Sequence, residues 1–327
     1  MLRFLLRRAL VMIPLLIGIT FIVFFVMDLA PGDPFGEMRL NPSFSPDTVA
    51  ALEREFGFGQ PLLVRYGKWL WRAAHFDLGL SVAYRVPVAD LLAMRVLNTL
   101  ILAVASIAFS WLLAIPLGIF AALRPHSPRD RLLALVAFLG MSVPNFFLAF
   151  LLMVLALRTG WFPIGGTTSI DYESLGLGAR IADRLHHLVL PVLVLGLGGM
   201  AGLMRLMRGQ ILALKDADFV RTARAKGAPE RRVVWKHILR NALNPFVTLA
   251  GYELGTLLSG AALVEAVMNL QGLGTLLLEA VRSLDVFLVM GAVLLGALLL
   301  LLGNLLADLA LTAVDPRIDP NRLEAAR

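Results

Sequence analysis

Residues 9–29 read ALVMIPLLIGITFIVFFVMDL, an apolar run with one charged residue, Asp28, near its end. A helix of about 20 apolar residues covers the ~30 Å hydrocarbon layer of a bilayer. Similar runs lie at 99–123, 132–157, 188–207, 245–268 and 286–311. The sequence therefore predicts an all-α integral membrane protein with six transmembrane helices.

The first run follows Arg3, Arg7 and Arg8, and a signal peptide also begins with basic residues. The run is, however, longer than the roughly 7–15 apolar residues of a signal peptide. The residues after it, Ala30-Pro31-Gly32-Asp33-Pro34, also make a poor cleavage site. We therefore expect the first run to be retained as a transmembrane helix.

The composition fits a membrane protein and excludes several kinds of chemistry. Charged residues make up 16% of the chain, whereas a soluble domain contains about 25%. Cysteine is absent, which excludes a disulfide, a thiolate metal site and a cysteine nucleophile. No HExxH or GxSxG pattern occurs, and the adjacent His186 and His187 would point in different directions on a helix. We expect no catalytic residue, no cofactor and no metal.

The basic residues predict the orientation of the chain. Nineteen of the 30 Lys and Arg residues lie at the N-terminus, in 124–131, in 205–240 and in the tail from Arg317. Segments rich in Lys and Arg stay in the cytoplasm under the positive-inside rule. Both termini are therefore predicted to be cytoplasmic. The same rule explains the net charge of +7, so no nucleic acid partner is expected.

The long outer loop between the first two runs carries helix signals of its own. Ser45-Pro46-Asp47 supplies an N-cap and a proline at the first helical position, and Gly57 ends this short helix. Helical spacing then recurs at Leu62, Leu63, Tyr66, Trp69 and Leu70, with Trp71 beside them. This pattern is typical of a helix at the membrane interface, with its aromatic side chains at headgroup depth.

We divide the chain into three parts on these signals. Residues 1–95 hold the first helix and the outer loop, residues 96–312 hold a five-helix core, and residues 313–327 form a cytoplasmic tail. The core includes a long cytoplasmic loop at about 208–244.

That loop contains a helix, a glycine and a second helix. Asp216 or Asp218 can cap the first helix, and Gly227 can take the left-handed conformation at its end. Pro229-Glu230 suits the start of the second helix.

The second helix also has an apolar stripe, because Val234 with Ile238 and Trp235 with Leu239 are spaced four residues apart. A loop that only fixed orientation would need no such order. We therefore infer that it docks on a cytoplasmic partner, in the way that a short helix enters a groove of another protein.

Residues 218–227 read DFVRTARAKG and residues 237–242 read HILRNA. The loop closely resembles that of bacterial ATP-binding-cassette importer permeases, in the dipeptide, oligopeptide and nickel branch. Their general form is Glu-Ala-Ala, three residues, Gly, nine residues and Ile-x-Leu-Pro. The peptide branch instead has Asp-Tyr-Val-Arg-Thr-Ala-Arg-Ala-Lys-Gly and later His-x-Leu-Arg-Asn-Ala, which this chain follows more closely.

The resemblance covers nearly the whole chain. Further landmarks are Ala30-Pro31-Gly32-Asp33-Pro34, Asp77-Leu78-Gly79, Asn98-Thr99-Leu100, Gly272-Leu273-Gly274 and Asp315-Pro316-Arg317. One departure is Leu270-Gln271, where the family often has Trp-Pro, and it leaves the substrate class open.

The resemblance implies a type I importer permease fold and a dipeptide-permease B-type subunit in the bacterial inner membrane. Its implied partners are a homologous second permease, two cytoplasmic ATPases and an extracytoplasmic substrate-binding protein. The implied ATPase-coupling residues are Asp218, Arg221, Thr222, Ala223, Ala225, Lys226, Gly227, Pro229 and His237. This chain has no GxxxxGK[ST] loop to hold phosphates, so ATP hydrolysis is expected on the partners, which would drive alternating access.

Glu253, Glu265 and Asn98 are the candidates for a translocation path. An ionisable group at membrane depth is costly and usually faces an interior path, although a structural hydrogen bond would also explain Glu253. A secondary transporter driven by an ion gradient, with Glu253 as its coupling carboxylate, is the alternative function. The cargo stays open among a dipeptide, a longer peptide, nickel and glutathione, as does the existence of a homodimer.

Overall fold

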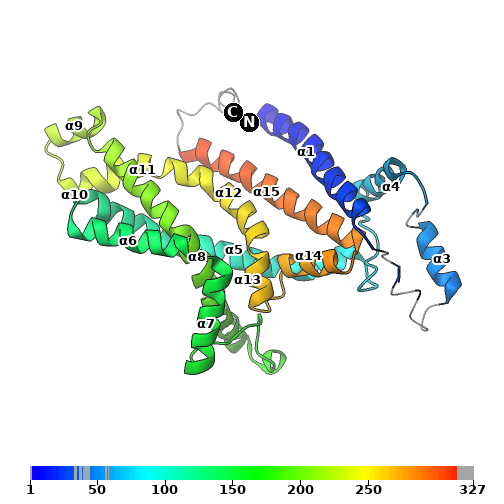
Figure 1. Cartoon of the computed structure of the whole chain (residues 1–327). Helices are drawn as coiled ribbons and strands as arrows, with labels where there is room; N and C mark the ends of the chain where they lie inside the picture. Colours follow the sequence, from blue (N-terminus) through cyan, green and yellow to red (C-terminus); the bar gives the residue numbers. More distant parts are fainter. Residues whose placement is uncertain are drawn as a thin grey trace. The chain divides into compact units, whose positions relative to one another are not determined.

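The structure is a computed structural model that describes residues 2–32, 35–36, 39, 45–55, 57 and 59–314 (Figure 1). The landmarks Asp33-Pro34 and Asp315-Pro316-Arg317, and residues 315–327 of the predicted tail, lie outside the described residues. The chain forms two compact units, which are described separately. Unit 1 comprises Met1–Thr99 and Gln271–Leu299, and unit 2 comprises Leu100–Leu270 and Leu300–Arg327.

The regular elements of the described residues are all helices. Four are long and apolar enough to cross a membrane, namely α1 (Leu2–Leu29), α5 (Val88–Leu123), α8 (Leu177–Leu214) and α15 (Val286–Val314). They contain four of the six predicted spans. With 36 and 38 residues, α5 and α8 are longer than a ~30 Å hydrocarbon layer requires.

A fifth predicted span is interrupted by a sharp bend. The predicted run 132–157 forms α6 (Pro128–Ser142) and α7 (Asn145–Thr159), whose axes differ by 96° (Figure 1). Val143 has an extended conformation with ψ at 118°, because the ring of Pro144 disfavours the helical conformation in the residue before it. The expectation of one continuous helix at 132–157 was therefore wrong.

The remaining predicted span, 245–268, is also not one helix. It forms α12 (Asn244–Gly260) and α13 (Ala262–Val267), with Ala261 between them. At 17 residues, α12 is about 25 Å long and falls short of the ~30 Å layer. Gly260 weakens the helix end, because glycine costs about 1 kcal/mol relative to alanine in a helix. The described residues thus contain four apolar spans, or five if α6 and α7 count as one.

In unit 1, the outer loop folds onto α1. The predicted first helix is α3 (Pro46–Glu55), and Gly57 follows it with φ at 72°. The second is α4 (Leu62–Ala74), in which Tyr66 and Trp69 are buried. The Tyr66 hydroxyl donates to the Ile17 carbonyl at 2.8 Å. Tyr66 and Trp69 thus pack inside the protein, and the depth at which α4 lies in the membrane stays a prediction.

Asp285 holds the loop after α4 against the start of α15. Its carboxylate is fully buried and accepts hydrogen bonds from the Ser81 hydroxyl at 2.5 Å and the Ala83 amide at 3.1 Å. It also accepts from the Leu288 amide at 3.1 Å, which caps α15. Residues about 200 positions apart in sequence are thereby joined.

Unit 2 is built around α8. Its core includes Met204, Met207 and Ile211 of α8 together with Phe246 of α12. Backbones approach closely where glycine allows it, since a Cβ atom at Gly251 would lie 2.5 Å from the Gly303 carbonyl oxygen. Such contacts fix the spacing of α12 and the last part of α15.

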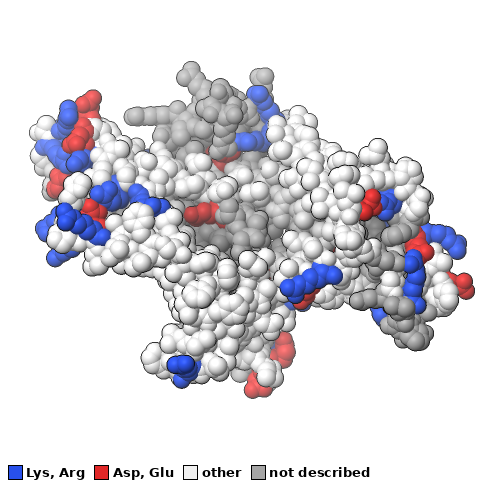
Figure 2. Space-filling model, in the orientation of Figure 1, with Lys and Arg blue, Asp and Glu red and all other residues white. Residues whose placement is uncertain are grey.

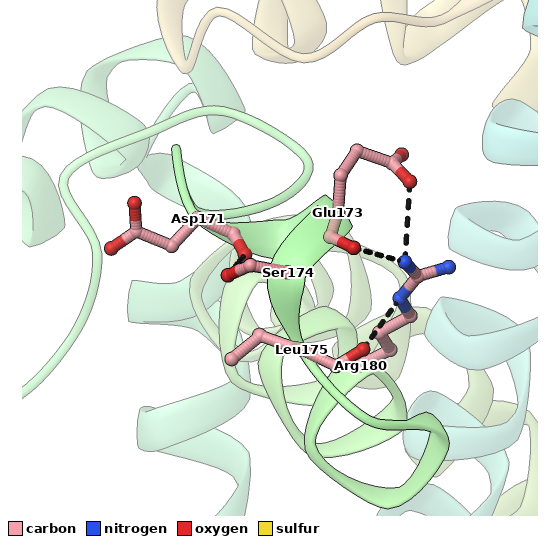
Figure 3. Close-up of polar contacts among 5 residues, drawn as sticks. All are labelled: Asp171, Glu173, Ser174, Leu175 and Arg180. Atoms are coloured by element: carbon pink, nitrogen blue, oxygen red, sulfur yellow. Dashed lines mark hydrogen bonds and ion pairs between the residues drawn. The ribbon is translucent and has the colours of Figure 1, made fainter.

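The segment between α7 and α8 is an ordered loop that contains a 3-10 turn, η1 (Tyr172–Ser174). Arg180 of α8 points back into this turn and donates to the Leu175 carbonyl at 2.9 Å and to the Glu173 carboxylate at 3.3 Å (Figure 3). The Ser174 hydroxyl donates to the Asp171 carbonyl at 2.7 Å. These contacts hold the loop over the first turn of α8.

Candidate functional site

The cytoplasmic loop predicted from the sequence forms α9 (Asp218–Ala225), α10 (Glu230–Arg232), the π-helical turn η2 (Val233–Ile238) and α11 (Leu239–Ala242) (Figure 1). Gly227 lies between α9 and α10 with φ at 76°. A residue with a Cβ is disfavoured in this left-handed region, so glycine suits the turn. Pro229 precedes the first residue of α10, as predicted.

The predicted N-cap of α9 was wrong. Ala217 occupies the cap position and makes no side-chain hydrogen bond, while Asp218 is the first helical residue. A carboxylate in the first turn still favours the helix through its dipole. The Thr222 hydroxyl donates to the Asp218 carbonyl at 2.8 Å.

The inner face of the loop packs into the core of unit 2. Val220, Val233 and Ile238 are at most 1% exposed and belong to the same core cluster as Met207 and Ile211 of α8. The apolar contact between loop and helix means that a displacement of α9 acts directly on α8. The loop is therefore mechanically attached to a transmembrane helix.

The second helix of the loop departs from regular α-helix geometry. In η2 the Leu239 amide donates to the Val234 carbonyl, five residues earlier. Val234 and Ile238 are buried, as the predicted apolar pair requires, but the Trp235 side chain is 54% exposed. Such π-type turns are rare in helices and frequent at functional sites.

An ion pair closes the turn at Gly227. Arg224 donates to both carboxylate oxygens of Glu230, at 3.1 and 2.7 Å, and its third nitrogen donates to the Lys215 carbonyl at 3.0 Å. The Arg224 guanidinium lowers the pKa of Glu230, and the carboxylate raises the pKa of Arg224 in return. Arg224 thus joins the ends of α8 and α9 to the start of α10.

Sequence reasoning placed Glu230 at the start of the second helix but did not pair it with Arg224. The sequence does carry a signal for this pair, because the opposite charges of Arg224 and Glu230 flank Gly227, the glycine that ends the first helix of the loop.

The residues implied as ATPase-coupling lie on different faces. Most are exposed, namely Asp218, Arg221, Thr222, Ala225, Lys226, Gly227 and Pro229. His237 is half-buried, and Ala223 is buried in the core. Basic side chains, with acidic ones among them, gather on the surface over α9 and α10 (Figure 2). Phe219 and Trp235 add two exposed aromatic side chains to this loop.

A second ion pair lies at the base of the loop. Asp130 at the start of α6 accepts from Arg208 of α8 through both oxygens, at 2.7 and 2.8 Å, and from the His126 amide at 2.8 Å. The Ser127 hydroxyl in turn accepts from the Asp130 amide at 3.3 Å. Sequence reasoning missed this pair, although Ser127 and Asp130 have the spacing of a capping box.

The candidate path residues have defined contacts. Glu253 of α12 is half-buried and accepts from the Trp111 indole nitrogen at 3.0 Å. Glu265 of α13 is 1% exposed and lies beyond the break at Ala261. Asn98 belongs to unit 1, where its amide donates to the Gln271 carbonyl at 2.8 Å. The two glutamates therefore lie on successive helices of unit 2, and their role in a path stays a prediction.

The two adjacent histidines engage different groups. His186 bonds to the Trp161 carbonyl at 2.9 Å, whereas His187 bonds to the Asp183 carbonyl at 2.9 Å. Across the described part of the chain, no three His, Asp or Glu side chains gather as a metal site would require.

Two family patterns match this chain. Residues 114–320 match the binding-protein-dependent transport system inner membrane component, and residues 1–103 match the N-terminal part of such membrane components. The two matches leave only residues 104–113 and the last residues of the chain uncovered.

Relatives match over nearly their full length. The oligopeptide transport system permease protein AppB of Bacillus subtilis is 38% identical, covering 97% of this chain and 99% of the relative. The dipeptide transport system permease protein DppB of Escherichia coli is 36% identical, with the same coverage. Both relatives are named as permease proteins of peptide transport systems.

A solved structure supports the fold. The MetNI methionine ABC transporter, in an inward-facing conformation, matches with a TM-score of 0.53 and 21% identity. The match covers 69% of this chain and 96% of the other chain. The chain therefore has the fold of a type I importer permease.

Proposed function

We propose that this chain, which belongs to the family of inner membrane components of binding-protein-dependent transport systems, carries peptides through the membrane as one permease subunit of an ATP-binding-cassette importer. Its similarity to one relative named for oligopeptides and another named for dipeptides supports a peptide cargo. ATP is hydrolysed by separate cytoplasmic subunits, because this sequence has no phosphate-binding GxxxxGK[ST] loop.

The loop around Gly227 transmits the movement of an ATPase subunit to the membrane helices. The observation that carries this role is the division of the loop into two faces. Val220, Val233 and Ile238 are packed in the core with α8, whereas Phe219 and Trp235 are exposed. One face can therefore occupy a groove of a partner while the other moves α8.

The permease subunit works with partners on both sides of the membrane. A homologous second permease completes the membrane pore, and an extracytoplasmic protein delivers the cargo. The distribution of Lys and Arg supports a cytoplasmic location for both termini. Glu253 and Glu265 contribute to the path, with Glu253 positioned by its hydrogen bond from Trp111. Asn98 is the third residue of the proposed path.

Cross-linking tests the coupling role directly, because the natural chain has no cysteine. Trp235→Cys should form a cross-link with a cysteine in the ATPase groove. Trp71→Cys, which replaces a more exposed side chain in the predicted outer loop, should not. An impermeant maleimide should label Trp71→Cys in intact cells and reach Trp235→Cys only after permeabilisation. The reverse labelling would overturn the orientation and the coupling role together.

A matched pair of glycine variants tests whether the loop drives transport. Gly227 and Gly59 both have positive φ, and a Cβ at either would meet no atom within 4 Å. Gly227→Trp should therefore insert normally but lose vanadate-sensitive uptake of a labelled di- or oligopeptide. Gly59→Trp has a similar backbone strain in the outer loop and should keep this uptake. Unchanged uptake by Gly227→Trp would reject the role of the loop.

A further inference from the structure

A pocket of about 130 Å³ lies in unit 1 where α1 ends. Two charged residues line it, Asp28 of α1 and Arg65 of α4, and Arg65 donates a hydrogen bond to the Asp28 carboxylate. Their side chains are 31% and 15% exposed, so the pair is sheltered but reachable from outside. Apolar side chains, including Phe24 and Leu284, complete the walls.

The position of the pocket along α1 sets its depth in the membrane. The apolar run of α1 extends to Asp28 and is long enough to cross the hydrocarbon layer. Asp28 therefore lies at the level of the lipid headgroups, on the outer side in the orientation proposed above. Beside it, Phe25, Val26 and Leu29 are 44%, 58% and 66% exposed and form an apolar surface for acyl chains.

We propose that this pocket binds the headgroup of a phospholipid that carries a primary ammonium, namely a phosphatidylethanolamine. Arg65 donates to the lipid phosphate, and Asp28 accepts N–H bonds from the ammonium. A guanidinium has five N–H donors and can serve more than one acceptor. Its carbon lies 5.5 Å from the centre of the Phe24 ring, a cation–π contact that holds the guanidinium in place.

Charge and size both favour this ligand. Arg65 and Asp28 together carry no net charge, so a zwitterion can satisfy both groups, whereas an anionic headgroup is repelled by Asp28. Phosphatidylcholine is also a zwitterion, but its quaternary ammonium has no N–H to donate. A cavity of roughly 150 Å³ holds benzene. The pocket is somewhat smaller, so it takes the terminal aminoethyl group, while the phosphate lies at its mouth beside Arg65 and the acyl chains lie on the exposed surface of α1.

Native mass spectrometry of the full chain in detergent tests the proposal, with lipids of identical acyl chains added singly. We expect phosphatidylethanolamine to bind about tenfold more tightly than phosphatidylcholine or phosphatidylglycerol, the difference expected for a hydrogen bond to a charged group. Equal binding of the three lipids would overturn the proposal. A zwitterionic dipeptide that displaces the lipid at equal concentration would also overturn it and assign the pocket to cargo.

Three variants locate the site. Asp28→Asn should abolish the preference for the ethanolamine lipid, and Ala30→Phe should abolish it by filling the pocket while leaving the ion pair intact. Arg72→Gln is the control, since Arg72 lies on the same helix as Arg65 but outside the pocket and forms an ion pair with Asp77, which follows the helix. It should keep the preference. If Ala30→Phe folds and retains the wild-type preference, the pocket is not the site.

Discussion

Arg208 donates hydrogen bonds to both oxygens of the Asp130 carboxylate, at 2.7 and 2.8 Å, and so joins the end of α8 to the start of α6. The two side chains differ in burial: Asp130 is 7% exposed and Arg208 is 29% exposed. The loss of folding stability therefore depends on which partner is removed, because an unpaired charge costs more free energy the deeper it is buried.

Arg208→Gln should therefore destabilise the protein more than Asp130→Asn. The first variant leaves a buried carboxylate without its cation and should cost about 2–4 kcal/mol. The second removes the buried charge and leaves Arg208 partly in contact with solvent. Thermal unfolding in detergent measures both. Arg205→Gln, on the same face of α8 but with no ion pair shown in the described residues, is the control, and equal losses in the two test variants would contradict this account.

Gly251→Ala should destabilise unit 2. A Cβ at this position would meet the Gly303 carbonyl oxygen at 2.5 Å and the Ala307 Cβ at 2.8 Å, and backbone atoms cannot move aside without shifting a helix. Overpacking of this kind costs about 1–3 kcal/mol. Gly202→Ala, which would meet nothing within 4 Å on α8, should be neutral or slightly stabilising. A melting temperature of Gly251→Ala that matches wild type would show that the helices separate easily.

Asp285→Ala should loosen unit 1 more than Ser81→Ala does. The aspartate variant removes the acceptor of three hydrogen bonds from a fully buried site, at an expected cost of about 3 kcal/mol. The serine variant loses one donor, and the carboxylate keeps its two backbone partners. Hydrogen exchange at the amides of Ala83 and Leu288 distinguishes the two, since both amides should exchange faster in Asp285→Ala. Unchanged exchange there would refute the role assigned to Asp285.

The Arg224–Glu230 pair should make the loop sensitive to acid. Because Arg224 lowers the pKa of Glu230 below its ordinary 4.5, the folded loop holds this proton less tightly than the unfolded chain. Its stabilisation is therefore complete above the unfolded pKa and is lost as the pH falls through the lowered folded value. Both side chains are more than a third exposed, so the effect should be small.

Glu230→Gln measures this contribution. The difference in melting temperature between wild type and Glu230→Gln should be constant from pH 7 to about pH 5 and shrink at lower pH. Glu173→Gln, which removes a more exposed carboxylate in the loop between α7 and α8, is the control and should show no such dependence on pH. A difference that grows as the pH falls would reverse the predicted sign.

Much of the coupling loop was predictable from sequence because its determinants are local. Gly227 ends α9 and Pro229 precedes α10, and each acts through backbone geometry within a few residues. The capping residue of α9 was not predictable, because two aspartates were equally suited and the chain uses Ala217 instead. The exposure of Trp235 depends on the π-helical turn, which no spacing in the sequence indicates.

By itself, the sequence determined that α1, α5, α8 and α15 are membrane helices, because a long apolar run is stable in lipid whatever it packs against. Only the tertiary structure decided the angle between α6 and α7, the break after α12, and the pairing of Asp130 with Arg208 and of Ser81 with Asp285. Such pairs form when packing brings distant segments together, and their energies depend on burial, which exists only in the folded chain.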